Sequence, residues 1–369
     1  MKGLKASRKY VKDFNLDYAN VAPVYPGRSC DLFGLKLIKW PGSNVPGHAL
    51  RSEQSFQYIE GEYMTADEYD DLIADPTLYL LTKYIPRICP GLKGLEAFSG
   101  ACGATTAASM MFFLLSFAMG PAKQGFETIQ KGAKLFIQDM VPSVLGGMDF
   151  TSKYGLPEIL GGFTIAPFDI VGDTLRGTRG IMLDMFRQPE KLAAACDAVV
   201  PMALKLATST YTVGGPPFIF IPLHKGADGF MSTEQFAKFY WPSYEKLLLA
   251  IIDAGLIPIS FAEGGYNARL DYIASESKIP AGRSMWMFDQ TDMKAAKEKL
   301  GHAACIGGNV PTSLLAAGTP QEVEEYCRKL FDDAAEGGGF FLSPGAVVQD
   351  AKPENVHALL NSSWKFGVY

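Results

Sequence analysis

The chain has 369 residues, of which 48% are hydrophobic and 12% aromatic, and its formal net charge is −5. This composition excludes intrinsic disorder, and the length fits two or three ordinary domains or one large α/β barrel with insertions. The sequence has no stretch dense in Lys and Arg, so we expect no nucleic-acid partner.

The first 90 residues have a pattern of helices and loops. A helix is predicted over residues 65–73, and the Asp75-Pro76 pair that follows is a break. The region lacks the regular alternation of strands and helices that appears later in the chain. We therefore predict an N-terminal extension or cap over residues 1–90 and a barrel over residues 91–369.

The apolar runs and the cysteines bear on the cellular compartment. The longest apolar run, Met110 to Met119, has about half the ~20 residues of a membrane helix, and we expect its methionine-rich part, Met110 to Leu115, to lie in the core. The basic N-terminus has no apolar segment typical of a secretory signal. The six cysteines show no Cys-x-x-Cys spacing, which favours reduced thiols. We expect a cytoplasmic protein that has no membrane partner.

The second half of the chain alternates between short apolar strands and helices. Strands are predicted at residues 163–165, 218–221, 256–260, 285–288, 303–306 and 340–342. Helices are predicted at residues 232–255, from about 268, and at 292–300, 320–336 and 353–360. The helices at 232 and 320 begin with capping-box patterns, Ser232-Thr-Glu-Gln235 and Thr319-Pro-Gln-Glu322.

Continuously apolar strands that alternate with helices indicate βαβ units and a parallel sheet. No strand is followed by a dinucleotide-binding or Walker A glycine pattern, which disfavours an open nucleotide-binding sheet. We therefore predict the α/β class, with a closed (β/α)8 TIM barrel that carries a helical N-terminal extension.

Polar residues follow the predicted strands, at the end where barrels of this kind place their active sites. Glycines among them would let a ligand approach the backbone, as in a small-molecule site. Each residue also has a structural interpretation, such as a turn, a helix cap or a side chain at the barrel mouth. The candidates are Asp169, His224, Asp228, Glu263, Tyr266, Asp289, Asn309 and Ser343.

Four segments carry a resemblance to a known family: Tyr63–Pro76, Gly308–Val323, Gly338–Gly345 and Pro353–Val356. They resemble the uroporphyrinogen decarboxylase superfamily, and most closely its corrinoid-dependent methyltransferase branch. The resemblance implies a (β/α)8 barrel and an enzyme that moves a methyl group to or from a cobamide. It further implies that a separate corrinoid protein carries the cobamide, and that the chain can form a homodimer.

The thiol-methylating members of that branch hold zinc with a His-x-Cys pair after one strand and a Cys after the last strand. The corresponding positions here are Phe261, Glu263 and Ala346. Since neither phenylalanine nor alanine has an atom that binds zinc, we do not expect the usual thiol-activating site. A rebuilt zinc site that uses Glu263 and His224 is the alternative.

The resemblance therefore implies a methyltransferase or demethylase without the zinc site. The methyl group would pass between the corrinoid protein and a tetrahydrofolate-like acceptor or a small methylated compound, such as a methylamine or an aryl methyl ether that undergoes O-demethylation. Glu263, or Asp289 beside it, would hydrogen-bond or protonate the pterin or the leaving group as the general acid, and His224 is the third catalytic candidate. Asn309 would orient the substrate ring, and the remaining candidates, Asp169, Asp228, Tyr266 and Ser343, would bind the substrate.

Two other functions stay open at this point. The first is a decarboxylase of an aromatic or tetrapyrrole acid, for which Arg176, Arg179 and Arg187 are the clustered cations. The second is a non-catalytic barrel that lost the zinc ligands and serves as a binding module.

Overall fold

The chain forms two groups of packed elements in a computed structural model that describes residues 2–18, 26–52, 54, 56–211 and 215–367. The helical unit comprises Met1–Lys12, Leu16–Pro157 and Val171–Ala198. The sheet unit comprises Asp13–Asn15, Glu158–Ile170 and Val199–Tyr369. The division of the chain at residue 90 into an extension and a barrel stays a prediction.

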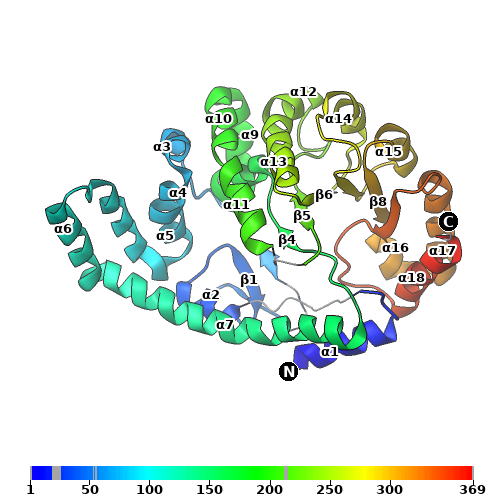
Figure 1. The fold of residues 1–369 in the computed structure, drawn as a ribbon, viewed down its shortest axis with the longest axis horizontal. Helices are drawn as coiled ribbons and strands as arrows, with labels where there is room; N and C mark the ends of the chain where they lie inside the picture. The colour runs from blue at the N-terminus through cyan, green and yellow to red at the C-terminus, as the bar shows by residue number, and fades with distance from the viewer. Residues whose placement is uncertain (1, 19–25, 53, 55, 212–214, 368–369) are drawn as a thin grey trace. The chain divides into compact units, whose positions relative to one another are not determined.

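The sheet unit is built on a six-stranded parallel sheet in which the strands follow their order along the chain (Figure 1). The strands are β4 (Gly162–Phe163), β5 (Phe218–Leu223), β6 (Ile257–Ala262), β7 (Met285–Phe288), β8 (Cys305–Val310) and β9 (Phe340–Pro344). The α/β class and the parallel sheet are confirmed. The predicted closure by eight strands is not seen in the described residues, where the ladder runs from β4 to β9.

Helices separate the strands of the sheet unit and lie along their outer side in Figure 1. They are α11 (Val200–Thr210), α12 (Thr233–Gln235), α13 (Trp241–Asp253), α14 (Leu270–Glu276), α15 (Met293–Leu300), α16 (Thr312–Ala317), α17 (Pro320–Ala334) and α18 (Pro353–Phe366). Both capping boxes predicted from the sequence form, at Ser232 and at Thr319. The fold is therefore TIM-barrel-like in its strand and helix order.

Strand β8 lies two residues later than predicted, and this changes the place of a candidate residue. The backbone N–H groups of Ala303 and Ala304 both donate to the Leu300 carbonyl, so these residues form a turn after α15. The strand continues through Gly307 and Gly308, residue types that are uncommon in strands. Asn309 consequently lies within the strand rather than after it.

The helical unit contains most of the first 198 residues. A small sheet in the order β2-β1-β3 is formed by β1 (Ile38–Pro41), β2 (Ala49–Leu50) and β3 (Gln57–Tyr58). The helices are α1 (Lys2–Asp13), α2 (Gly27–Phe33), α3 (Tyr69–Ala74), α4 (Pro76–Tyr79), α5 (Ile85–Ile88), α6 (Ala107–Ala118), α7 (Gly120–Tyr154), α9 (Gly177–Arg187) and α10 (Pro189–Ala198). The predicted helix at 65–73 forms as a 3-10 turn over Ala66–Glu68 that leads into α3.

The prediction that Met110 to Leu115 lies in the core is wrong. The run forms α6, which has no buried residue, and Met111 and Phe112 are 71% and 74% exposed. An apolar helix usually predicts burial, but α6 is apolar on every side and packs along one side alone. Its sequence therefore could not indicate which side would be covered.

One helical segment in the described part of the chain, Pro189–Thr210, is long and apolar enough to cross a membrane by length and composition. It consists of α10, Val199 and α11, and six of its side chains are buried: Leu192, Ala195, Cys196, Val199, Ala203 and Ala207. The core helices of a globular protein pass the same test.

Candidate functional site

Three candidate residues follow directly after strands whose last residues are paired in the sheet. Leu223, Ala262 and Phe288, at the ends of β5, β6 and β7, are register partners of one another in turn. His224, Glu263 and Asp289 come next in the sequence and therefore lie at the same carboxyl edge. The His224 Nε2 and Glu263 Oε1 atoms are 4.0 Å apart, and both side chains are partly exposed.

Beside β7 and β8 lies a cavity of about 550 Å³ that contains two of the candidates, Asp289 and Asn309. It is lined by Asn267, Asp289, Gln290, Thr291, Asp292, Asn309, Pro311, Thr312, Ser313 and Tyr326. The volume is in the range of small-molecule sites. None of the lining residues is a Lys, Arg or His, so the two aspartates give the cavity an acidic character.

Asn309 is held in one orientation by bonds at both ends of its amide. Its Nδ2 donates to the Thr291 carbonyl at 2.7 Å, and the Tyr326 hydroxyl donates to its Oδ1 at 3.3 Å. Burial raises the pKa of Tyr326, so its hydroxyl remains a donor at neutral pH. Gly308, the residue before Asn309, has a backbone conformation that requires glycine. Its φ is +124°, and a Cβ there would lie 2.4 Å from the Phe288 carbonyl oxygen.

Asp289 connects the loops that follow three strands. Its Oδ2 accepts from the Gly264 N–H at 3.0 Å and from the Gln290 side chain at 3.2 Å. A Cβ at position 345 would lie 2.9 Å from Asp289 Oδ1, so the glycine leaves room for the carboxylate. The other acid of the cavity, Asp292, caps α15 by accepting from the Ala295 N–H.

Asp169 lies inside the protein and not at a ligand-facing surface. It is completely buried, and its two oxygens accept from the backbone N–H groups of His224 and Lys225 at 3.0 Å each. The Tyr240 hydroxyl donates to the same carboxylate at 2.7 Å. Asp169 therefore positions the start of the loop after β5. Tyr266 is also completely buried.

The side chains of Asp228 and Arg269 hold the rest of the loop after β5 in place. The Ala268 N–H donates to Asp228 Oδ2 at 3.0 Å, and Arg269 Nε lies 3.6 Å from Asp228 Oδ1. The buried Arg269 guanidinium also donates to the carbonyls of Gly226 and Ala227 and to Thr233 Oγ1. Burial lowers the pKa of Arg269, and Asp228 opposes this effect. Both side chains are therefore used to hold the loop.

The last candidate, Ser343, lies within β9 beside Asn309 in register. Its hydroxyl donates to the Pro344 carbonyl at 3.1 Å. Ser343 and Asn309 are thus neighbours in the sheet, although Ser343 does not line the cavity.

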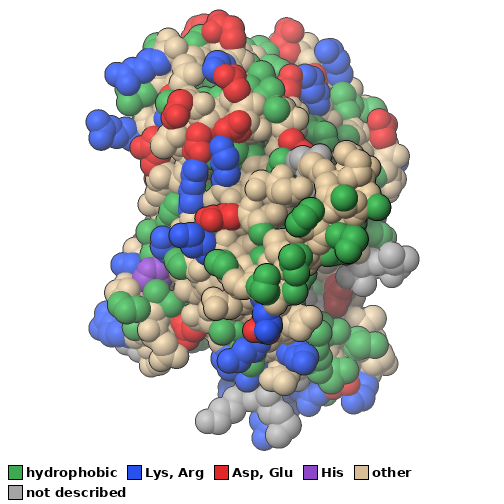
Figure 2. All heavy atoms as spheres, turned by 90° about the vertical axis from the view of Figure 1, so that its left-hand side faces the viewer, with side chains coloured by type: hydrophobic (Ala, Val, Ile, Leu, Met, Phe, Trp, Pro, Cys, Tyr) green, Lys and Arg blue, Asp and Glu red, His purple; other side chains and the backbone are tan. Residues whose placement is uncertain are grey.

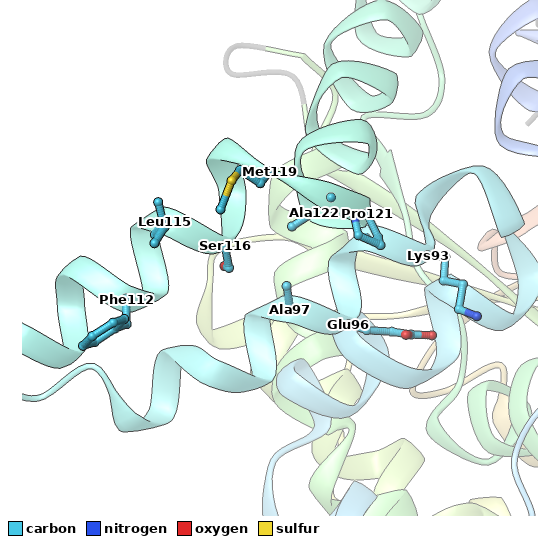
Figure 3. Close-up of a pocket in the computed structure, with 11 residues that line it drawn as sticks. Lys93, Glu96, Ala97, Phe112, Leu115, Ser116, Met119, Pro121 and Ala122 are labelled. Carbon is cyan, nitrogen blue, oxygen red and sulfur yellow. The ribbon is translucent and has the colours of Figure 1, made fainter.

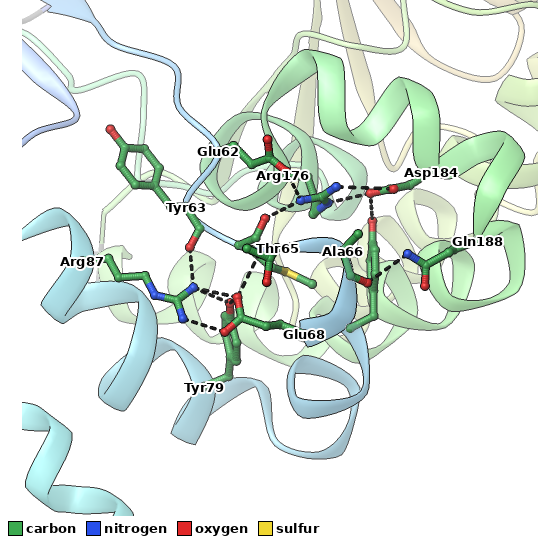
Figure 4. A network of polar contacts seen from close by, with 12 residues as sticks. Glu62, Tyr63, Thr65, Ala66, Glu68, Tyr79, Arg87, Arg176, Asp184 and Gln188 are labelled. Carbon is green, nitrogen blue, oxygen red and sulfur yellow. Dashed lines mark hydrogen bonds and ion pairs between the residues drawn. The ribbon is translucent and has the colours of Figure 1, made fainter.

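The arginine cluster proposed for a decarboxylase is not assembled as a binding group. Arg176 is buried in the helical unit, where its Nε donates to Asp184 at 2.6 Å and its Nη1 to Glu62 at 2.5 Å (Figure 4). Arg179 and Arg187 are exposed. Because its guanidinium is already bonded to two carboxylates, Arg176 has a structural role, and this prediction is wrong for it.

The residues present do not fit the zinc site implied by the resemblance. The Phe261 side chain is buried in β6, and its ring lies 5.6 Å from that of Phe220. Within the described ranges, no group of three or more His, Cys, Asp or Glu residues is arranged to hold a metal ion. His224 and Glu263 would supply two ligands, fewer than the three protein ligands of catalytic zinc sites.

The cavity also contains residues that the sequence did not point to, above all Tyr326 and Thr291. Tyr326 lies on α17, a predicted helix, but nothing in its spacing showed that its hydroxyl would reach Asn309 in the strand before. Thr291 closes the cavity wall through its backbone carbonyl. The bonds to the Asn309 amide depend on tertiary packing and have no sequence pattern.

Comparisons with known proteins agree with the family resemblance. The family model described as uroporphyrinogen decarboxylase (URO-D) matches residues 124–365, more than half of the chain. The uroporphyrinogen decarboxylase of Syntrophotalea carbinolica is 23% identical over 200 residues, which cover 54% of this chain and 56% of the relative. That of Citrobacter koseri is 22% identical over 201 residues, 54% of this chain and 55% of the relative. The chain thus matches a little over half the length of these relatives.

A solved structure, a methyltransferase from Methanosarcina mazei, is similar over almost the whole chain. The TM-score is 0.58, the sequence identity is 15%, and the match covers 99% of this chain and 85% of that one. At this identity the match shows a shared fold alone, and it agrees with the TIM-barrel-like arrangement of β4 to β9.

Proposed function

This chain belongs to the uroporphyrinogen decarboxylase family, and within that family we propose that it transfers methyl groups and does not release carbon dioxide. The methyl group would pass between a small methylated compound, or a tetrahydrofolate-like acceptor, and a corrinoid carried by a separate protein. The fold shared with a methyltransferase is compatible with this proposal. The observation that carries it is the charge of the cavity beside β7 and β8.

A decarboxylase of a tetrapyrrole polycarboxylate has to attract several negative charges. The cavity has two carboxylates, Asp289 and Asp292, and no cationic side chain among its lining residues. Carboxylates repel an anionic substrate, and the repulsion is stronger where water is partly excluded. The cavity therefore favours a neutral or cationic compound, such as an aryl methyl ether or a protonated methylamine.

The side chains at this carboxyl edge include groups that could act as an acid catalyst and a group that could orient the substrate. We propose that the Asp289 carboxylate, anchored by the Gly264 N–H, takes up a proton and passes it to the leaving group as the methyl group departs to cobalt. Glu263, with His224 4.0 Å away, is the alternative acid. The fixed amide of Asn309 would orient the substrate, and holding the reactants in line would supply much of the rate. The corrinoid supplies the methyl-carrying cobalt, and its protein would dock over this carboxyl edge.

The test compares the two reactions on the same purified protein. The chain is mixed with methylcobalamin and a panel of pterin, thiol and amine acceptors, and the visible absorbance of the cobalamin is followed. In parallel, carbon dioxide release from uroporphyrinogen is measured. We expect a cobalamin change with at least one acceptor and no carbon dioxide. Carbon dioxide release without any cobalamin change would establish the decarboxylase, and inactivity in both assays would favour the non-catalytic barrel.

A matched pair of variants assigns the acid. Asp289→Asn keeps an oxygen for the Gly264 N–H but removes the carboxylate that takes up and passes on the proton, so we expect kcat to fall by roughly 10²- to 10⁴-fold. Asp292→Asn removes the other charge of the same cavity, and asparagine caps helices as well as aspartate does. We expect the control to alter KM and leave kcat within a few-fold. Equal loss of kcat in both variants would contradict the role of Asp289.

A further inference from the structure

The most unusual surface of the helical unit is the one around α6. Residues 97–122 form a run of 26 residues without a single charged side chain. This run includes the end of the 3-10 segment η3 (Pro90–Gly103), all of α6 and the first residues of α7. We call η3, α6 and the first two turns of α7 the apolar hairpin.

One side of α6 packs within the apolar hairpin. The rings of Phe113 and Phe117 lie against that of Phe98, at centroid distances of 6.3 and 5.2 Å, and Phe117 also meets Phe126 at 4.8 Å. These contacts place positions 113 and 117, which are one helical turn apart, on the inner side of the helix. The rings thus hold α6 against η3 and α7.

The remaining sides of α6 are apolar and exposed. Met111, Phe112, Leu114 and Leu115 point in different directions around the helix, since successive residues are turned by about 100°. Leu114 and Leu115 are 59% and 49% exposed, and Met111 and Phe112 are more exposed still. A single protein partner would cover one of these sides and leave the others in water.

A groove of about 540 Å³ continues the apolar surface between α6 and η3. Phe112, Leu115 and Met119 line its α6 side, and Ala97 lies across from them (Figure 3). Lys93 and Glu96 lie at its other end, where the charge-free run begins. The groove and the exposed sides of α6 therefore form one continuous apolar region.

Lysines border this region on the neighbouring elements. Lys93 precedes the charge-free run, and Lys123, Lys131 and Lys134 follow it on α7, all of them exposed. Glu96 and Glu127 are the acids in the same stretches, so the border has a positive balance. Figure 2 shows the face that includes α6, where hydrophobic side chains are exposed near Lys and Arg side chains.

Contrary to the expectation of no membrane partner, we propose that the apolar hairpin binds the surface of a lipid bilayer that contains anionic lipids, with α6 immersed at the level of the headgroups and the outer acyl chains. Lipid can surround a helix that is apolar on all of its free sides, and the bordering lysines would meet lipid phosphates. A 12-residue helix is about 18 Å long, too short to cross a hydrocarbon layer of about 30 Å. The hairpin would therefore lie in the interface without spanning it.

The test is flotation of the full chain with lipid vesicles in a sucrose gradient. Vesicles of phosphatidylcholine alone are compared with vesicles that also contain phosphatidylglycerol, at low and high salt. We expect the protein to float with the anionic vesicles, and less of it to float at high salt or with phosphatidylcholine alone. A chain that stays at the bottom of the gradient under all conditions would overturn the proposal.

Two exposed phenylalanines provide a matched pair of variants. Phe112→Asp in α6 places a charge in the lipid, so we expect the partition coefficient to fall by roughly tenfold or more. Phe186 in α9 is 75% exposed, and Phe186→Asp should leave vesicle binding unchanged. Circular dichroism of both variants checks that they fold.

A second measurement separates lipid from a second copy of the chain. Light scattering without lipid gives the oligomeric state of the natural chain and of Phe112→Asp. We expect the two to be the same. If Phe112→Asp converts a dimer to a monomer, or if it and Phe186→Asp reduce flotation equally, α6 is not a lipid-binding element. Lys131→Glu with Lys134→Glu should weaken binding to the anionic vesicles alone.

Discussion

The carboxylate of Asp169 offers the sharpest test of how the loop after β5 is held. Three donors converge on it: two backbone N–H groups at 3.0 Å and the Tyr240 hydroxyl at 2.7 Å. Burial raises the pKa of Tyr240 well above its usual value, and the nearby Asp169 charge raises it further. The tyrosine therefore remains a protonated donor across the physiological range.

The expected loss of unfolding free energy for each substitution follows from the number of hydrogen-bond donors that it affects. Tyr240→Phe removes one hydrogen bond to a charged group, which costs about 1.5–3 kcal/mol. Asp169→Ala leaves three donors without their acceptor, two of them on the buried residues Lys225 and Tyr240, and should cost about 3–5 kcal/mol. In the sheet unit, the loss of about 1.5–3 kcal/mol expected for Tyr240→Phe corresponds to a Tm lower by roughly 3–12 °C.

Thermal unfolding followed by circular dichroism measures both variants and their combination. Because the two side chains are in contact, the double variant should lose less than the sum of the single losses, by about 0.5–3 kcal/mol. Asp169→Asn should recover part of the loss, since its amide oxygen still accepts from a backbone N–H. Additive losses, or a Tyr240→Phe variant as stable as the natural chain, would refute this account of the loop.

Two further predictions concern charged groups in the described structure. Hydrogen bonds from Arg87 lower the pKa of Glu68 to about 2, so the stability from this pair is present above about pH 4.5 and is lost as the pH falls toward 2. Glu68→Gln should cost about 1–3 kcal/mol at pH 7, discounted for the partial exposure of Arg87, and unfolding curves of the two proteins should converge as the pH falls from about 4.5 to about 2; a constant difference would contradict this. Arg269→Lys keeps the charge but loses the planar fork that bonds several carbonyls, so we expect a loss of roughly 2–4 kcal/mol and faster proteolysis within residues 224–233. An unchanged Tm would show that one ammonium group suffices there.

The sheet unit was largely predictable because its signals are local. Short apolar strands bounded by Gly and Pro were found at their places, and both capping boxes form as their spacing indicates. The boundaries of β8 were displaced because two alanines were counted as strand and two glycines were not. Propensity alone could not show that Gly307 and Gly308 are in the strand, since close packing decides it: Gly307 lies against the Phe341 ring of β9, and Gly308 against the Phe288 backbone of β7.

The sequence predicted the location of the candidate site better than it predicted the role of each residue there. The end of each strand placed His224, Glu263 and Asp289 at one edge, and the register pairs agree. The same rule also selected Asp169, whose carboxylate is enclosed by three donors. The sequence pattern around a carboxylate that lines a cavity, such as Asp289, is the same as that around a buried one, such as Asp169. The difference depends on which other elements pack against the side chain.

Two of the three positions that the resemblance matches to zinc ligands, Phe261 and Glu263, lie at the carboxyl end of β6. Phe261 and Glu263 are two residues apart on and just beyond β6, so they point to the same face of the sheet. At the first position a ring now packs against Phe220, and this apolar contact helps to hold β5 and β6 together. A phenylalanine there stabilises the sheet and offers no atom that could bind a metal ion. What the edge retains is a histidine, carboxylates and an amide, and these groups move protons and orient a substrate. A chain with such an edge would rely for its methyl chemistry on positioning and acid catalysis, and that is why Asp289→Asn is the variant that bears most directly on the proposed function.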